Sequence, residues 1–240
     1  MQSSRMALPL TTIRTKLLFK LAFSLTCGII LSGCGHLFYY PSRNAFSDPG
    51  KFGLKYETVT LHTSDGVKLH GWYFPAKNKD RRPAKGTFIQ FHGNAQNITT
   101  HFASLVWVIE AGYNFFTFDY RGYGTSEGNP SQEGLYRDAL AAIHYIHERE
   151  PRPAARNGTK QTEPDLVFYG QSLGGAVLLR ALEDVPDRSR IRLVAIDSSF
   201  HSYKSVARRK LAGHWVTFLF QPLGWLLVSD AYSPEDSIPK

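Results

Sequence analysis

The sequence predicts an α/β fold, in which a mostly parallel sheet is flanked by helices and carries an antiparallel hairpin at its N-terminal edge. From residue 86 onward, strand-like runs alternate with helical runs, which is typical of the crossover units that build a parallel sheet. Before them, two alternating runs lie on either side of Ser64-Asp65-Gly66, and Asp-Gly favours a tight hairpin turn. With 240 residues and no internal repeat, we expect one such domain over residues 56–240.

Each element follows from the spacing of its apolar residues. Strand-like runs are found at 57–63, 67–75, 86–94, 114–120, 165–170 and 191–200. Helical runs are found at 98–112, 131–149, 172–185 and 201–212. In the first helical run Phe102, Leu105, Val106 and Ile109 share one face, and Gly112 is its expected end. In the second run the shared face is formed by Leu135, Ala139, Ile143 and Ile146.

The first 33 residues have the layout of a secretory leader. A basic segment precedes the apolar run 21–31, which is shorter than the roughly 20 residues of a membrane span. Leu31-Ser32-Gly33-Cys34 resembles the lipobox of bacterial lipoproteins, in which the leader is cut before a cysteine that carries a diacylglycerol. We therefore expect a signal peptide over 1–33, lipidation of Cys34 and attachment to the membrane through that lipid. An ordinary cleaved leader and an uncleaved anchor are the alternatives.

The residues around Cys34 also bear on location. Gly35 follows the cysteine instead of the aspartate associated with inner-membrane retention, which favours the outer membrane of a bacterial envelope, on its periplasmic face. If Cys27 leaves with the leader and Cys34 is acylated, no disulfide can form. Residues 34–55, which mix Pro, Gly and Ser with aromatics, are expected to be a tether.

Charge and composition exclude two classes of function. The leader holds four basic residues and no acidic ones, so the net charge of +8 falls to +4 without it. Short basic clusters begin at residues 81, 188 and 207, but no stacking aromatics or nucleic-acid motif accompany them, so we expect no nucleic-acid binding. No Cys, His and carboxylate residues cluster at ligand spacing, so we expect no metal and no organic cofactor.

The run 165–175, DLVFYGQSLGG, predicts a nucleophile elbow. Gly170-Gln171-Ser172-Leu173-Gly174 lies between a strand and a helix, where the turn is so sharp that the serine backbone is strained and side chains two residues away would collide. Ser172 is therefore the candidate nucleophile, and the amide of Leu173, at the helix N-terminus, is a candidate oxyanion donor. A structural turn with a solvated serine is the alternative.

A second oxyanion donor is expected after the strand at 86–94. That strand ends in Phe91-His92-Gly93-Asn94, where Gly93 allows a tight loop, and the amide of Asn94 is the candidate. We interpret His92 as a residue that braces this loop, because it precedes the serine in the chain; a catalytic base is the alternative.

Four motifs together resemble the α/β-hydrolase superfamily, and within it the serine-aminopeptidase-like and bud-emergence-type branch. They are HGNAQN at 92–97, DYRGYGTSEG at 119–128, GQSLGG at 170–175 and DSSF at 197–200. The resemblance covers roughly residues 55–240. It implies acyl transfer from an ester or other small acyl substrate through a covalent acyl-serine, with the loop at 119–124 at the mouth of the site. We interpret Asp119 and Arg121 as charges that brace this loop.

A serine nucleophile needs an imidazole base and a carboxylate to orient it. After Ser172 the only histidines are His201 and His214. The resemblance implies that the acid and the histidine each follow a further strand, so we expect the chain to be incomplete at its C-terminus, with the last strands and both catalytic partners missing. Asp197 as the acid, and either histidine as the base, are weaker alternatives.

The sequence therefore favours a membrane-tethered serine hydrolase of carboxylic esters. A peptidase is a weaker hypothesis, because no pocket that would recognise an amine is evident from the sequence. Trp215, Phe218, Phe220 and Trp225 are candidates to line an acyl pocket, although core packing is the commoner use of such residues. The alternative from another class is a catalytically incomplete lipoprotein that keeps the fold as a binding or scaffolding surface. The absent histidine favours that alternative, and the intact elbow favours the enzyme.

Overall fold

The computed structural model describes residues 38–77, 83–150, 165–213, 218, 221–222, 225 and 228–236. The chain divides into two compact units, 1–38 and 39–240, and every helix and strand given below belongs to the second. The predicted leader, Cys34, His214, Trp215 and Phe220 lie outside the described residues.

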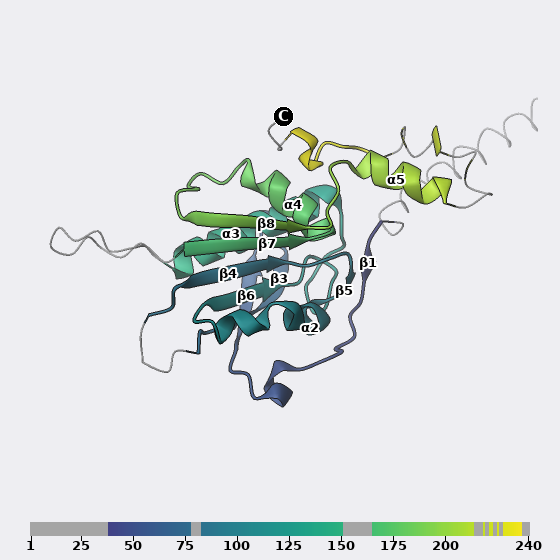
Figure 1. Ribbon diagram of the computed structural model, residues 1–240. Helices are drawn as coiled ribbons and strands as arrows, with labels where there is room; N and C mark the ends of the chain where they lie inside the picture. Colours follow the sequence, from purple (N-terminus) through teal and green to yellow (C-terminus); the bar gives the residue numbers. More distant parts are fainter. Residues whose placement is uncertain are drawn as a thin grey trace, which may run out of the picture. The chain divides into compact units, whose positions relative to one another are not determined.

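A six-stranded sheet forms the centre of the second unit. Its strands are β2 Glu57–His62, β3 Lys68–Phe74, β4 Gly86–Phe91, β6 Asn114–Phe118, β7 Asp165–Gln171 and β8 Ile191–Asp197. They lie in the order β2-β3-β6-β4-β7-β8 (Figure 1). β3 is antiparallel to β2 and β6, whereas β6, β4, β7 and β8 are mutually parallel. The predicted fold, with its antiparallel hairpin at the N-terminal edge, is confirmed.

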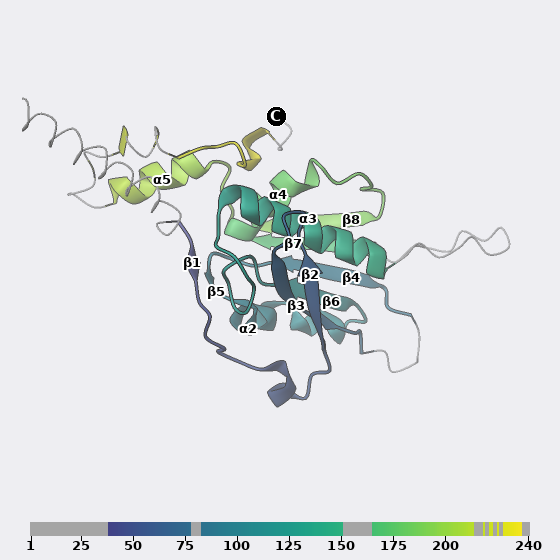
Figure 2. The same ribbon diagram turned by 180° about the vertical axis from the view of Figure 1, so that it is seen from behind.

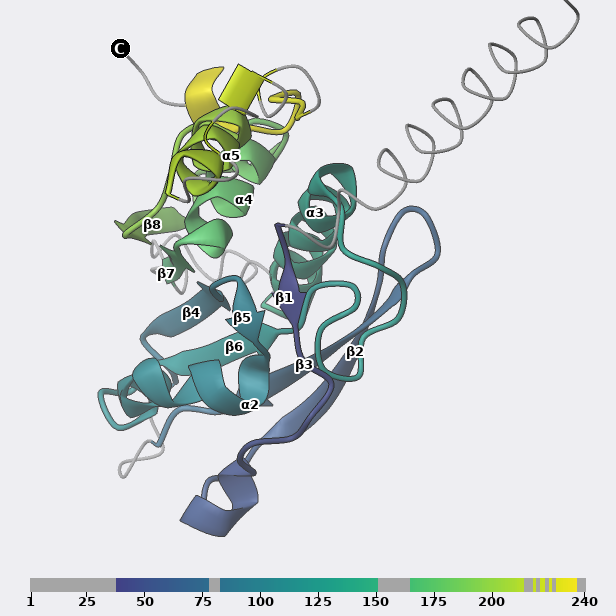
Figure 3. The ribbon, with the colours of Figure 1, turned by 90° about the vertical axis from the view of Figure 1, so that its right-hand side faces the viewer.

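Helices cover both faces of this sheet. α3 Gln132–Arg149 and α4 Leu173–Leu182 pack side by side on one face (Figure 2). α2 Ile98–His101 lies on the opposite face (Figure 3). The apolar stripe predicted for α3 is buried, from Leu135 to Ile146. None of the helices in the described ranges combines the length and apolarity needed to cross a bilayer.

The run 98–112 differs from the single helix that its spacing predicts. α2 is followed by two 3-10 turns, η3 Phe102–Ser104 and η4 Val106–Ile109. Leu105 between them has φ −123° and ψ −9°, outside the helical region. The β-branched residues that follow it disfavour a helix, yet Phe102 and Ile109 are still buried in the core. Gly112 ends the segment, as predicted, with φ +90°.

This core fixes the segment that follows β4. Trp72 and Phe74 on β3 and Phe115 on β6 pack against Ile98 and Phe102. The rings of Phe74 and Phe102 stack with an angle of 8° between their planes. Because Ile98 and Phe102 come just after the HGNAQN loop, the aromatic core anchors the far end of that loop.

Residues 39–55, part of the segment that the sequence assigns to a tether, pack within this second unit. β1 Tyr40–Pro41 pairs in parallel with β5 Ala95–Gln96, which lies within the HGNAQN loop. Tyr39 is buried. The segment therefore adds a short strand beside the loop that carries Asn94.

Candidate active site

Ser172 stands at the junction between β7 and α4 in a strained backbone conformation. Its φ is +51° and its ψ −114°, a region that residues with a side chain rarely occupy. The residue is partly exposed. A partly exposed serine between a parallel strand and a helix, with this backbone conformation, has the geometry of a nucleophile elbow.

The two flanking glycines leave no room for side chains. A Cβ on Gly170 would lie 2.6 Å from the Cα of Gly175. A Cβ on Gly174 would lie 2.0 Å from the carbonyl oxygen of Phe91 and 2.6 Å from that of His92. The second contact also shows that the first turn of α4 lies directly against the start of the His92-Gly93-Asn94 loop.

The elbow is held from the neighbouring strand. The N–H of Ser172 donates to the carbonyl oxygen of Asp197 at 2.8 Å, and the hydroxyl of Ser199 donates to the carbonyl oxygen of Ser172 at 2.9 Å. Leu173 is the first residue of α4, so its N–H has no acceptor within the helix. The positive end of the helix dipole therefore lies next to Ser172, the residue that precedes the helix.

His92 is a buried residue at the start of the HGNAQN loop. It is fully buried, and because a carbonyl only accepts, its Nδ1–H donates to the oxygen of Gly93 at 2.7 Å. Its Nε2 lies 3.6 Å from Asp119 Oδ1, beyond hydrogen-bond distance, and that oxygen accepts from the N–H of Ile98 at 2.8 Å. Burial lowers the pKa of His92 to about 3, so the ring is neutral. This geometry agrees with a bracing role for His92 and Asp119.

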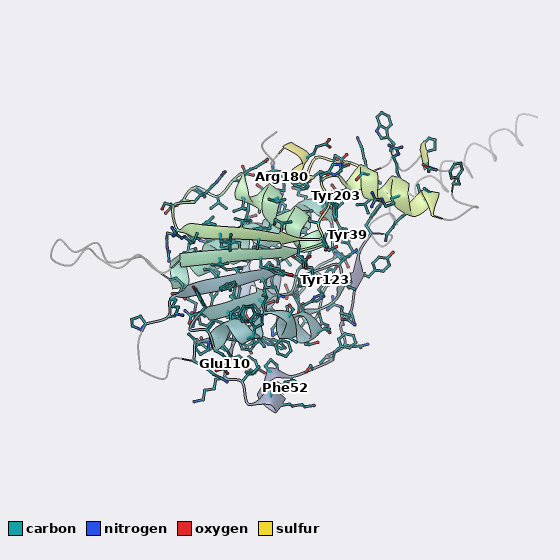
Figure 4. All side chains as sticks on the ribbon, in the orientation of Figure 1. Tyr39, Phe52, Glu110, Tyr123, Arg180 and Tyr203 are labelled. Atoms are coloured by element: carbon teal, nitrogen blue, oxygen red, sulfur yellow. The ribbon has the colours of Figure 1, made fainter. Side chains whose placement is uncertain are left out.

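Asn94 is held on two sides. The hydroxyl of Tyr123 donates to the carbonyl oxygen of Asn94 at 3.0 Å and to its Oδ1 at 2.8 Å. From β1, the N–H of Tyr40 lies 3.3 Å from that carbonyl oxygen and 3.2 Å from Oδ1. Figure 4 shows Tyr123 at the same end of the sheet as Tyr39 and Tyr203, near β1 and α5 Tyr203–Ala212. These bonds fix the Asn94 backbone within the loop whose start lies against the elbow.

Tyr40 and Tyr123 are supporting residues that the sequence analysis did not single out. Tyr123 lies in the predicted mouth loop, but its partner is 29 positions away and no local pattern gives that pairing. The one available signal for Tyr40 is the aromatic run Phe38-Tyr39-Tyr40, which is unusual in a solvated tether.

The mouth loop is braced by charge, as predicted. Arg121 donates to both carboxylate oxygens of Asp65, at 2.8 and 3.0 Å, and its Nε donates to Asp138 at 2.9 Å. Hydrogen bonds from Arg121 hold the pKa of Asp65 well below its usual range. Burial raises the pKa of Asp138 to about 6, although Arg121 opposes the shift. The cluster joins the hairpin turn, the mouth loop and α3.

The candidate acid and base in the described residues do not form a relay with Ser172. Asp197 lies beside the elbow, where its carboxylate accepts from the hydroxyls of Ser198 and Tyr169, each at 2.8 Å. These two hydrogen bonds, that of Ser198 first, lower its pKa. His201 is exposed, and within the described residues no hydrogen bond joins it to Ser172 or Asp197. The described ranges also contain no cluster of three or more potential metal ligands.

Of the predicted pocket aromatics, Phe218 and Trp225 fall within the described residues. They are 57% and 61% exposed, so neither packs in the core. Trp225 lines a surface hollow together with Arg208, Gln221 and Pro222. The hollow lies beside α5.

Comparison with known proteins places this geometry in a family. Residues 82–236 match the family model described as "Hydrolase_4: Serine aminopeptidase, S33". The chain belongs to this family. The "Uncharacterized protein YfhR" of Escherichia coli K12 is 35% identical over 235 residues, which cover 97% of this chain and 74% of YfhR. "Protein bem46" of Schizosaccharomyces pombe is 31% identical over 167 residues, covering 69% of this chain and 51% of that protein. The resemblance read from the four motifs is thus confirmed.

Solved structures confirm the α/β-hydrolase fold. The esterase Pf2001 of Pyrococcus furiosus superposes with a TM-score of 0.55 over 80% of this chain and 69% of that chain, at 23% identity. Family and fold together support hydrolase activity in this member of the serine-aminopeptidase-like α/β hydrolases.

Proposed function

We propose that this α/β hydrolase cleaves carboxylic esters through an acyl-serine on Ser172. The observation that supports this most is the strained elbow lying against the loop that carries Asn94. The Ser172 oxygen attacks the acyl carbon and loses its proton to a base, while the amides of Leu173 and Asn94 stabilise the oxyanion. The carbon–oxygen bond to the alcohol then breaks, and the alcohol leaves with a proton. Water releases the acid and restores the serine.

The base is the part of this proposal that rests on the family resemblance. The resemblance implies that a histidine and an acid complete the relay with Ser172. Without an imidazole at the serine, the oxyanion hole and substrate binding alone sustain a residual acceleration of about 10³–10⁴-fold over water in serine proteases. An alcohol leaves an ester more readily than an amine leaves an amide. A site formed by Ser172 and the amides of Leu173 and Asn94 therefore favours esters over peptides as substrates.

The proposal includes a lipid anchor. Cys34 carries a diacylglycerol after removal of residues 1–33, and the protein is held at the periplasmic face of the outer membrane. The basis is the lipobox and Gly35.

Turnover of two chromogenic substrates tests the reaction. We expect the full chain to hydrolyse p-nitrophenyl acetate faster than Ser172→Ala does, because only a chain with the Ser172 hydroxyl can form the acyl-enzyme. An aminoacyl p-nitroanilide should show no such difference. Ser64→Ala, which alters an exposed turn serine, should match the unmodified chain. If folded protein and Ser172→Ala hydrolyse the ester equally, the alternative function as a binding or scaffolding lipoprotein is favoured.

A further inference from the structure

The outer surface of α5 carries charges of one sign. Lys204, Arg208, Arg209 and Lys210 lie on this helix, which contains no Asp or Glu. Tyr203 and Ala207 are buried on its inner side, whereas residues 208–210 are exposed. The nearby Asp230 accepts from the Ser202 hydroxyl at 3.0 Å and from the N–H of Lys204 at 3.1 Å, so its carboxylate caps the N-terminus of the helix.

Exposed aromatic rings lie among these cations. Tyr40 is 53% exposed, and the Lys210 ammonium sits 4.4 Å from its ring centre and 2.7 Å from its hydroxyl oxygen. Trp225 is 61% exposed, with the Lys204 ammonium 5.3 Å from its ring centre. Arg208 shares the hollow beside Trp225. We call the surface formed by Tyr40, Lys204, Arg208, Arg209, Lys210 and Trp225 the basic aromatic face.

We propose that the basic aromatic face binds the surface of a bilayer that contains anionic phospholipids. Lys and Arg near such a surface are attracted to its phosphates, and Trp and Tyr favour the boundary between headgroups and acyl chains. Exposed rings beside cations match the composition of interfacial segments, which combine Lys and Arg with aromatic residues. The proposal goes beyond acyl transfer, and its charge and ring arguments need no lipid anchor.

The position of Cys34 in the sequence also supports a bilayer as the partner of the basic aromatic face. Cys34 lies six positions before Tyr40, so even a fully extended chain spans at most about 20 Å between them. If Cys34 carries the proposed lipid, the bilayer surface lies within that distance of Tyr40, which Lys210 contacts. This step alone rests on the proposed anchor. Since α5 follows β8, a bilayer bound to the face lies at the end of the sheet where the elbow stands (Figure 1).

Partitioning of the full chain between buffer and vesicles tests the proposal. Vesicles of phosphatidylcholine alone are compared with vesicles that also contain phosphatidylglycerol. Arg208→Gln with Arg209→Gln removes two charges and keeps good helix formers. At about 1 kcal/mol for each basic residue near an anionic surface, this variant should bind anionic vesicles about 30-fold more weakly. Its binding to phosphatidylcholine should not change.

The matched control is Lys51→Gln with Lys55→Gln, which removes the same charge from exposed positions outside the face. It should change anionic binding by less than about threefold, because charges beyond a Debye length of the membrane are screened. The proposal is overturned if the chain does not distinguish the two vesicle types, or if the two double variants lose equal affinity.

Covalent labelling of Ser172 by a fluorophosphonate, measured on the same preparations, keeps the two proposals apart. An unlabelled protein that still prefers anionic vesicles would contradict only the proposal of acyl transfer. A labelled protein without that preference would contradict only the membrane-binding face.

Discussion

Asn94 shows how much of this site depends on a single side chain elsewhere. The Tyr123 hydroxyl bonds both oxygens of Asn94, so it fixes the backbone whose amide is the proposed oxyanion donor. Removing an oxyanion donor itself costs about 10²–10³-fold in kcat, and loosening one should cost less.

Tyr123→Phe is therefore expected to lower kcat for ester hydrolysis by about tenfold and to leave KM nearly unchanged, because the lost bond acts on transition-state stabilisation. Tyr136→Phe is the matched control, since its hydroxyl bonds Asp184 at 2.7 Å, on the surface between α3 and α4. Equal kcat values for the two variants, measured on p-nitrophenyl acetate, would contradict a positioning role for Tyr123.

Among single residues, the sequence predicts those whose role follows from a local pattern. It misses those whose contacts join distant parts of the chain. Ser172, Gly170 and Gly174 follow from one short pattern, because the elbow is a local structure. Tyr40 and Tyr123 reach Asn94 from distant parts of the chain. Their tyrosine identities alone carry no sign of that contact.

The elbow joins β7 to α4 with no spare volume. A Cβ on Gly174 would overlap backbone atoms of Phe91 and His92, which are themselves part of β4 and its loop and cannot move without disturbing the sheet. The constraint on Gly174 is steric contact with backbone, so even the smallest side chain should be excluded.

Gly174→Ala is expected to lower the free energy of unfolding by about 3 kcal/mol or more, the range of severe overpacking. Gly213→Ala is the control, because its Cβ would lie 3.6 Å from the nearest oxygen, an ordinary contact. Urea unfolding of both variants measures the difference. If the two variants unfold at the same urea concentration, the packing described for the elbow is incorrect.

Elements with clear periodicity are predicted well, and those formed by distant pairing are not. The strands β2, β3, β4, β6, β7 and β8 and the helices α3 and α4 follow from the pattern of their apolar residues, because each of them is buried against a neighbouring layer. Spacing also predicts the buried face of 98–112, but not its break at Leu105, since the core packing of Phe102 and Ile109 outweighs helical regularity. β1 and β5 have two residues each, too few for any periodic signal.

At the scale of the whole molecule, one buried charge cluster and one exposed edge stand out. Arg121 joins the hairpin turn, the loop at 119–124 and α3 through Asp65 and Asp138, so these three parts are tied together. At the edge of the sheet opposite β2, β8 is the last strand within the described residues, and the side chain of its Leu193 is 54% exposed. Exposed apolar edges favour pairing with another strand. The alternation of elements predicts the sheet, but the order of its strands comes from the structure.

The central claim is that the strained turn at position 172 presents a reactive hydroxyl to an oxyanion hole formed by the amides of Leu173 and Asn94. Labelling of the folded full chain with a fluorophosphonate, followed by mass-spectrometric mapping of the modified peptide, tests it most directly. We predict one adduct, on Ser172, that persists in Ser64→Ala and disappears in Ser172→Ala. Folded protein that gains no adduct at Ser172 would contradict the claim.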